Sequence, residues 1–169
     1  SPRVMGAAYV ANTLTVVIGT LLALPTIVGR SRTRLLAACG LAWASCWVII
    51  GSSGLWPQSA TAAALIILGL VAFSVGEVFA SPVAPALVND VATEQLRGRY
   101  NAAFGFTFSL GTTLGPLITA VTIGTGNSNA WIAIVVCGNL IASVMTLRLR
   151  THLTDPQDGR RAPDTTAQV

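Results

Sequence analysis

Five stretches of this 169-residue sequence are long and apolar enough to cross a lipid bilayer, and they constrain the fold more than any other feature. They cover about residues 5–28, 35–55, 61–88, 101–123 and 130–148. A helix needs roughly 20 apolar residues to span the hydrocarbon core, whereas a transmembrane β-strand shows about ten residues of alternating polarity. None of the five stretches alternates. The sequence therefore predicts an all-α transmembrane domain over residues 1–150, with about five membrane-spanning helices.

The charge content supports a membrane protein. Only 9% of the residues are charged, whereas a soluble domain typically carries about 25%. The charged residues also alternate between loops, because "GRSRTR" and "NDVATEQLRGR" carry charges and "GSSGLWPQ" and "GTGNSN" carry none. Arginine-rich loops favour the cytoplasmic side of a membrane. We therefore expect the charged loops and the C-terminus to be cytoplasmic.

The two ends of the chain lead to separate expectations. Residues 151–169 are rich in Asp, Arg, Pro, Gln and Thr, and this composition predicts a disordered cytoplasmic tail. The first residues, "SPRVMGAAY", resemble no signal peptide. The odd number of spans and the start at Ser1 suggest a piece of a longer protein.

Residues that could carry enzymatic or metal chemistry are scarce. Cys39, Cys46 and Cys137 lie inside apolar stretches without metal-ligand spacing, and His152 is isolated in the polar tail. The spans hold no paired aspartates, Ser/His pair or HExxH sequence. No nucleic-acid-binding motif accompanies the net positive charge. We therefore expect no enzyme, no metal, no cofactor and no nucleic-acid partner.

Glu77 is the only acidic residue in the apolar run "FSVGEVFASPVAP", residues 73–85. A charged side chain at the bilayer centre costs about 2.5–3.5 kcal/mol on insertion scales, which a carboxyl avoids by keeping its proton. Glu77 lies roughly 16 Å before the predicted helix end at Val88, too deep to reach the membrane surface. We expect it to face the protein interior or a water-filled cavity, on a helix bent by Pro82 and Pro85. Glu77 is then either linked to a proton or substrate, or hydrogen-bonded to a neighbouring helix as a neutral acid.

The segment "SLGTTLGPLITA", residues 109–120, combines glycines with a proline. Gly111 and Gly115 are four residues apart, so they share one helix face and allow a neighbouring backbone to approach closely. Pro116 has no amide to bond the carbonyl of Thr112, which allows a bend. The same pattern also occurs on ordinary helix-packing faces.

The segment "LVNDVATEQLRGRYNAAFGF", residues 87–106, contains a charged loop. Asp90 and Glu94 can reach Arg97 or Arg99 across a turn. Alternatively, an arginine pairs with the neighbouring cytoplasmic loop or caps a helix C-terminus, or the charges are simply solvated.

Three of these segments resemble the drug/proton antiporter branch of the major facilitator superfamily. "GEVFASPVAPALVNDVATEQLRGRY" resembles the passage from its tenth to its eleventh helix, and "GTTLGPLITA" is similar to the antiporter signature GxxxGPxxGG. Gly111, Gly115 and Pro116 match that signature, whereas Thr119 and Ala120 replace its final glycines. "GRSRTRLL" resembles the family's G-x-x-x-D-R-x-G-R loop without the aspartate.

The resemblance implies helices eight to twelve of a transporter in a bacterial plasma membrane. It implies proton-coupled export of small hydrophobic or amphipathic molecules by alternating access, with the missing N-terminal half, the lipid bilayer, the substrate and protons as partners. Glu77 becomes the candidate proton- or substrate-linked carboxyl. The candidate cytoplasmic gate consists of Arg30, Arg32, Arg34, Asp90, Glu94, Arg97 and Arg99. The alternative is a non-transporting membrane fragment, scaffold or accessory subunit.

Overall fold

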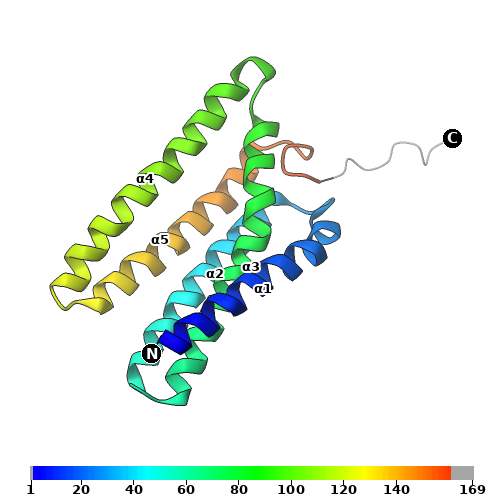
Figure 1. The fold of residues 1–169 in the computed structure, drawn as a ribbon. Coiled ribbons are helices and arrows are strands. Elements are labelled where there is room, and N and C mark those ends of the chain that lie inside the picture. Colours follow the sequence, from blue (N-terminus) through cyan, green and yellow to red (C-terminus); the bar gives the residue numbers. More distant parts are fainter. Residues whose placement is uncertain (1, 161–169) are drawn as a thin grey trace.

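The computed structural model describes residues 2–160, which form five long helices joined by short connections (Figure 1). The helices are α1 (Pro2–Ile27), α2 (Arg32–Ser52), α3 (Ala60–Val91), α4 (Arg97–Gly124) and α5 (Ser128–Leu149). Single 3₁₀ turns follow at Ser53–Leu55, Glu94–Leu96 and Arg150–His152. Each of the five helical segments is long and apolar enough to cross a membrane. The described residues contain no strand, so the predicted all-α membrane fold is confirmed.

Short polar residues determine where three of the helices begin. The side chains of Ser31, Ser59 and Asn127 each accept a hydrogen bond from a backbone amide in the first turn of α2, α3 and α5, respectively. These bonds satisfy amides that have no partner inside the helix. The helix ends agree with the predicted spans to within a few residues.

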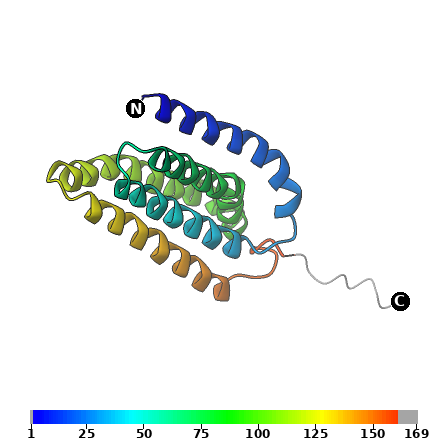
Figure 2. The same ribbon diagram turned by 90° about the horizontal axis from the view of Figure 1, so that it is seen from below.

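The helices pack around a central pair, α2 and α3. Figure 2 shows α1 and α5 on opposite sides of this pair, with α1 against α3 and α5 against α2. The fourth helix, α4, makes sparse contacts with α3 and α5 and has no buried residue of its own. The bundle is therefore well packed from α1 to α3 and at α5, and open along α4.

Two glycines lie at close contacts between helices. A Cβ atom at Gly40 would lie 2.2 Å from the Oγ of Ser143, so α2 and α5 approach at a position that excludes a larger residue. A Cβ atom at Gly76 would lie 2.5 Å from the Nε1 of Trp43. The same indole N–H donates a 3.1 Å hydrogen bond to the carbonyl of Phe73. Trp43 therefore fixes the rotation of α3 about its own axis.

One polar contact joins α1 to α3. The hydroxyl of Ser74, which is fully buried, donates a 2.7 Å hydrogen bond to the Oδ1 of Asn12. Polar groups of other spans bond carbonyls of their own helices, and examples are the side chains of Thr15, Thr107, Ser109 and Asn139. The polar residues within the spans thus serve mainly local hydrogen bonds, with the Asn12–Ser74 pair as an interhelical exception.

Helix α3 continues through both of its prolines. Pro82 and Pro85 lie inside the helix, and each lacks the amide that would bond the carbonyl four residues earlier, at Val78 and Ser81. Val78 directly follows Glu77, and Ser81 lies about one turn after it. The bend predicted at these prolines stays a prediction, because α3 remains helical from Ala60 to Val91.

Residues 150–160, which we call the C-terminal hook, fold back onto the start of α2. The backbone amide of Arg32 donates a 2.8 Å hydrogen bond to the carbonyl of Asp158, and the Asp158 side chain is fully buried. The prediction that the tail is disordered is therefore wrong for residues 151–160. The Asp158 side chain bonds Thr33 in the first turn of α2, and other polar side chains of the hook bond one another, instead of contacting only water. The prediction for residues 161–169 lies outside the described residues.

Candidate functional site

Glu77 lies near the middle of α3. Because α3 extends to Val91, Glu77 is about 21 Å from the C-terminal end of its helix, at 1.5 Å per residue. The side chain is half-buried. A short carboxylate at this position cannot reach the helix end, so its surroundings depend on the helices packed against α3.

The residues on either side of Glu77 determine where it points. Gly76 faces Trp43 of α2, and Val78 faces α1, where its Cγ2 lies 2.8 Å from the position of a Cβ on Gly19. Consecutive helix residues point about 100° apart. Glu77 therefore projects between the two directions of contact, onto a face of α3 that neither α1 nor α2 covers.

The Glu77 carboxylate has no partner among residues 2–160. The hydrogen bonds and ion pairs of this part of the chain leave Glu77 out. The interhelical hydrogen bond that the sequence offered as a structural alternative is therefore not formed within the described residues.

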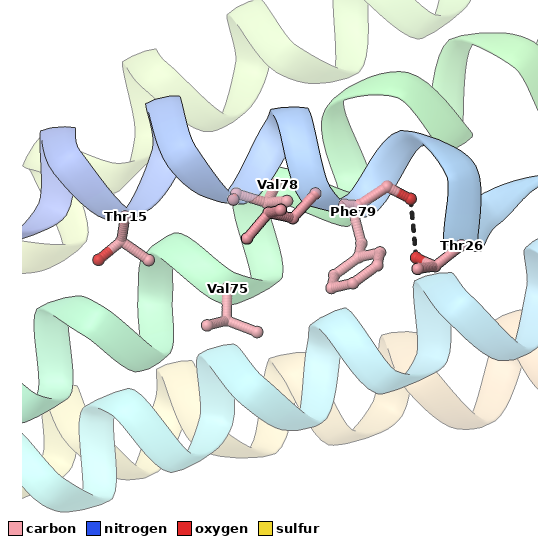
Figure 3. A pocket seen from close by; sticks show the side chains of 8 residues that line it. Thr15, Thr26, Val75, Val78 and Phe79 are labelled. Atoms are coloured by element: carbon pink, nitrogen blue, oxygen red, sulfur yellow. Dashed lines mark hydrogen bonds between the residues drawn. The ribbon is translucent and has the colours of Figure 1, made fainter.

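A cavity of about 220 Å³ opens between α1 and α3 (Figure 3). Its lining is almost entirely apolar and includes Leu22, Val75 and Phe79. Figure 3 also shows Thr15 and Thr26 at this cavity, but their hydroxyls donate to carbonyls of α1 itself. Glu77 is not among the lining residues. The carboxylate and the cavity thus lie on different sides of α3.

The antiporter-like segment lies on α4 without a neighbour. A Cβ atom at either Gly111 or Gly115 would meet no other atom within 4 Å, and Pro116 is exposed. The hydroxyls of Thr112 and Thr113 turn back to the carbonyl of Ser109, both at 2.9 Å. The glycine face that the sequence predicted is therefore present and open within the described residues.

The predicted gate charges divide into a paired and an unpaired set. Arg32 forms an ion pair with Asp90 and donates a 3.4 Å hydrogen bond to the carbonyl of Ala86. The unpaired set is exposed and makes no ion pair within residues 2–160: Arg30, Arg34, Glu94, Arg97 and Arg99.

The pairing of Asp90 with Arg97 or Arg99, one of the alternatives that the sequence left open, does not form within residues 2–160. Helix α3 continues to Val91, so Asp90 lies in its last turn. There it faces the start of α2, whereas Arg97 begins a separate helix. The pair that forms instead joins Asp90 to Arg32, the first residue of α2.

Asp158 connects the C-terminal hook to the start of α2, next to the Arg32–Asp90 pair. One carboxylate oxygen accepts hydrogen bonds from the amide and the hydroxyl of Thr33, at 2.9 and 2.8 Å. The other accepts from the Nε of Arg160 at 3.1 Å and lies 3.8 Å from the Nε of Arg150. Burial on its own would raise the pKa of Asp158, but the hydrogen bonds from Ser31 and Thr33 and the charge of Arg160 outweigh it. The pKa lies below its ordinary value, so this buried carboxylate stays charged at neutral pH.

Sequence reasoning missed this role of the hook. The Asp158–Gly159 pair is a common turn signal, and Gly159 indeed has a positive φ of 76°. That signal can reveal the turn but not its target, because Thr33 is 125 residues away.

Comparison with known proteins gives one match. The model of the Major Facilitator Superfamily matches residues 1–168, which include all five helices and the C-terminal hook. No curated protein and no solved structure matches the chain.

Proposed function

The chain belongs to the Major Facilitator Superfamily of membrane transporters, and we propose that it forms helices eight to twelve of a proton-coupled exporter. Its substrates would be small hydrophobic or amphipathic molecules. In such transporters the substrate binds near the bilayer midplane between two repeats, and the repeats rock around it. The antiporter-like segment of α4 and the degenerate "GRSRTRLL" loop before α2 support this placement. The start of α2, the end of α3 and the C-terminal hook meet at one end of the bundle, and the arginines there support a cytoplasmic C-terminus. The membrane we propose is a bacterial plasma membrane.

The half-buried carboxylate of Glu77 carries the proposal. It lies near the middle of α3, it has no partner within residues 2–160, and it points to a face that α1 and α2 leave uncovered. An ionisable group inside the membrane is costly and is most often functional. Protonation removes that cost, so binding and release of a proton at Glu77 would favour different arrangements of the helices around it.

The cavity between α1 and α3 supports the substrate class. Its lining offers almost no polar surface, because the hydroxyls of Thr15 and Thr26 are engaged by α1. Its volume of about 220 Å³ is below the roughly 300–1,000 Å³ of typical ligand pockets. It would therefore hold an apolar part of a substrate, while another group of helices completes the site.

The exposed α4 supports a missing N-terminal half as that other group. An apolar helix with no buried residue and an open glycine face suits close packing by a further helix. Among the candidate gate residues, Arg32 and Asp90 fasten α2 to α3. Glu94, Arg97 and Arg99 precede or begin α4 and are exposed, so they remain available to the N-terminal half.

The test is Glu77→Gln in the transporter that contains this chain, expressed in cells without other efflux pumps. We expect the variant to lose efflux of a lipophilic cationic dye driven by an imposed pH gradient. Exchange of labelled for unlabelled dye, which needs no net proton movement, should continue. Glu77→Asp should retain part of the gradient-driven efflux because it keeps a carboxyl.

Glu94→Gln is the matched control, since Glu94 is an exposed acid in the α3–α4 connection. Full gradient-driven efflux by Glu77→Gln would remove Glu77 from the mechanism. If the reading frame upstream encodes no further apolar spans and the wild type moves no dye, the non-transporting alternative stands.

A further inference from the structure

Two adjoining cavities lie where the α1–α2 loop meets the end of α3 and the C-terminal hook. They have volumes of about 350 and 420 Å³ and share Gly29, Arg30 and Arg160 in their linings. The first also has an apolar wall from the end of α1, from α3 and from the hook. That wall consists of Ile27, Val28, Pro82, Val83, Ala86 and Pro156.

The second cavity adds positive charge to this apolar wall. Arg30 and Arg34 line it, both are exposed, and neither makes an ion pair within residues 2–160. The other two arginines at the site already have acidic partners. Arg32 pairs with Asp90, and Arg160 pairs with Asp155 at 2.6 Å and with Asp158 at 3.1 Å. Among residues 2–160, the site therefore presents two guanidinium groups without an acidic partner beside an apolar surface.

This combination favours an amphipathic anion. Arginine matches phosphate oxygens with paired, charge-assisted hydrogen bonds. The apolar wall begins at the end of α1, and Val28, the residue after that helix, is 64% exposed, so the wall lies at the boundary between the apolar helices and the charged loops. A free phosphate would leave that wall uncovered, whereas a lipid would place glycerol and the first acyl carbons against it.

We propose that the headgroup of an anionic phospholipid occupies these cavities, with its phosphate between Arg30 and Arg34. Basic pockets at the cytoplasmic ends of membrane helices are suited to such headgroups. The hook completes the site, because Arg160 lines both cavities and is held within the hook by Asp155 and Asp158. The inference rests on the membrane placement in the proposed function but not on transport, so a chain that transports nothing could still bind this lipid.

The test titrates the detergent-purified chain with phosphatidylglycerol and, separately, with phosphatidylcholine of the same acyl chains. Native mass spectrometry measures the bound fraction. We expect wild type to prefer phosphatidylglycerol. Each of Arg30→Gln and Arg34→Gln should weaken its affinity about fivefold, and the double variant about thirtyfold, from the usual contribution of an arginine near an anionic membrane surface.

Arg148→Gln is the matched control. Arg148 is an exposed arginine in the last turn of α5 and lines neither cavity. Neither Arg30 nor Arg34 makes a side-chain hydrogen bond within residues 2–160, so their replacement breaks no described contact. Circular dichroism should confirm that helix content is unchanged.

Three results would overturn the proposal. The first is equal binding of the two lipids by wild type. The second is an equal loss in Arg148→Gln, which would indicate general surface attraction rather than a site. The third is a loss of bound phosphatidylglycerol when inorganic phosphate is added at the same concentration as the lipid. That result would indicate a phosphate site without a lipid component.

Discussion

The carboxylate of Asp158 binds both the backbone amide and the hydroxyl of Thr33, which lies 125 residues earlier in the chain. Thr33 is in the first turn of α2, where amides have no helical partner and the helix dipole favours an anion. The contact joins the last described segment to the start of α2. It also lies beside Arg32, whose Nη1 donates to the carbonyl of Gln157 at 3.1 Å.

The lowered pKa of Asp158 predicts a pH dependence. A carboxyl with a lower pKa in the folded state stabilises that state above its ordinary pKa and loses this contribution as the pH falls through the folded value. We expect protection of the Thr33 amide from hydrogen exchange to be constant near neutral pH and to fall below about pH 4. Asp158→Asn should lower the free energy of opening by about 1.5–3 kcal/mol at neutral pH and remove the acid dependence.

The matched control for that change is Asp155→Asn. Asp155 is 52% exposed and pairs with Arg160, so its loss should cost less than about 1 kcal/mol. Unchanged protection in Asp158→Asn would contradict the role assigned to the hook.

The Arg32–Asp90 pair predicts coupling between α2 and α3. In a double-mutant cycle of Arg32→Gln and Asp90→Asn, we expect a coupling energy of about 0.5–1 kcal/mol, because Asp90 is 45% exposed. The same cycle with Arg97→Gln should give a value near zero. Thermal unfolding in detergent measures both cycles. Coupling of Asp90 to Arg97 instead would restore the pairing that the sequence suggested.

Gly76 predicts a steric effect on the helix that carries Glu77. In Gly76→Ala the new methyl group would lie 2.5 Å from the Nε1 of Trp43, so either the indole or α3 must move. We expect a loss of stability of about 1–3 kcal/mol, as for other overpacked contacts. We also expect reduced gradient-driven efflux, because the rotation of α3 sets the direction of Glu77.

Gly111→Ala is the control for the steric effect, since a Cβ atom there meets nothing within 4 Å. It should leave the stability of the purified chain within about 0.5 kcal/mol of wild type. An equally stable Gly76→Ala would show that the Trp43 contact can relax without cost.

The open face of α4 predicts a separation between stability and assembly. Gly115→Leu should leave the melting temperature of the purified chain unchanged, because no neighbouring atom lies within 4 Å of a Cβ at this position. It should nevertheless reduce co-purification of this chain with a separately expressed N-terminal half. Gly98→Leu, which also meets open space but lies in the first turn of α4, is the control. Unaltered co-purification by Gly115→Leu would place the partner elsewhere.

Most of the fold could be predicted because it depends on local properties of the sequence. The length and polarity of each stretch determine whether it spans a membrane, and short polar residues such as Ser31 and Ser59 mark helix starts. Counting along one helix placed Glu77 roughly 16 Å before the helix end, and because α3 continues to Val91 the distance is about 21 Å. These features need no knowledge of which helices touch.

Features that depend on helix neighbours could not be predicted. The partner of Asp90 depends on the packing of α3 against α2, and the order of the hook depends on Thr33 being within reach of Asp158. Composition described residues 151–160 as polar but could not show that their polar groups have fixed partners. Likewise, the direction of Glu77 depends on Trp43, which occupies the space beside Gly76.

The pairing of α1 with α3 has a consequence for how the chain enters the membrane. α1 packs on α3 and scarcely touches α2, although α2 follows α1 in the chain and is synthesised before α3. The Asn12–Ser74 hydrogen bond can form only after α3, which carries Ser74, has been synthesised. During synthesis α1 must therefore wait for α3 before this contact forms, and its own sequence, with a mean hydropathy of 1.8 over its best 18-residue window, is apolar enough to cross a membrane in the meantime.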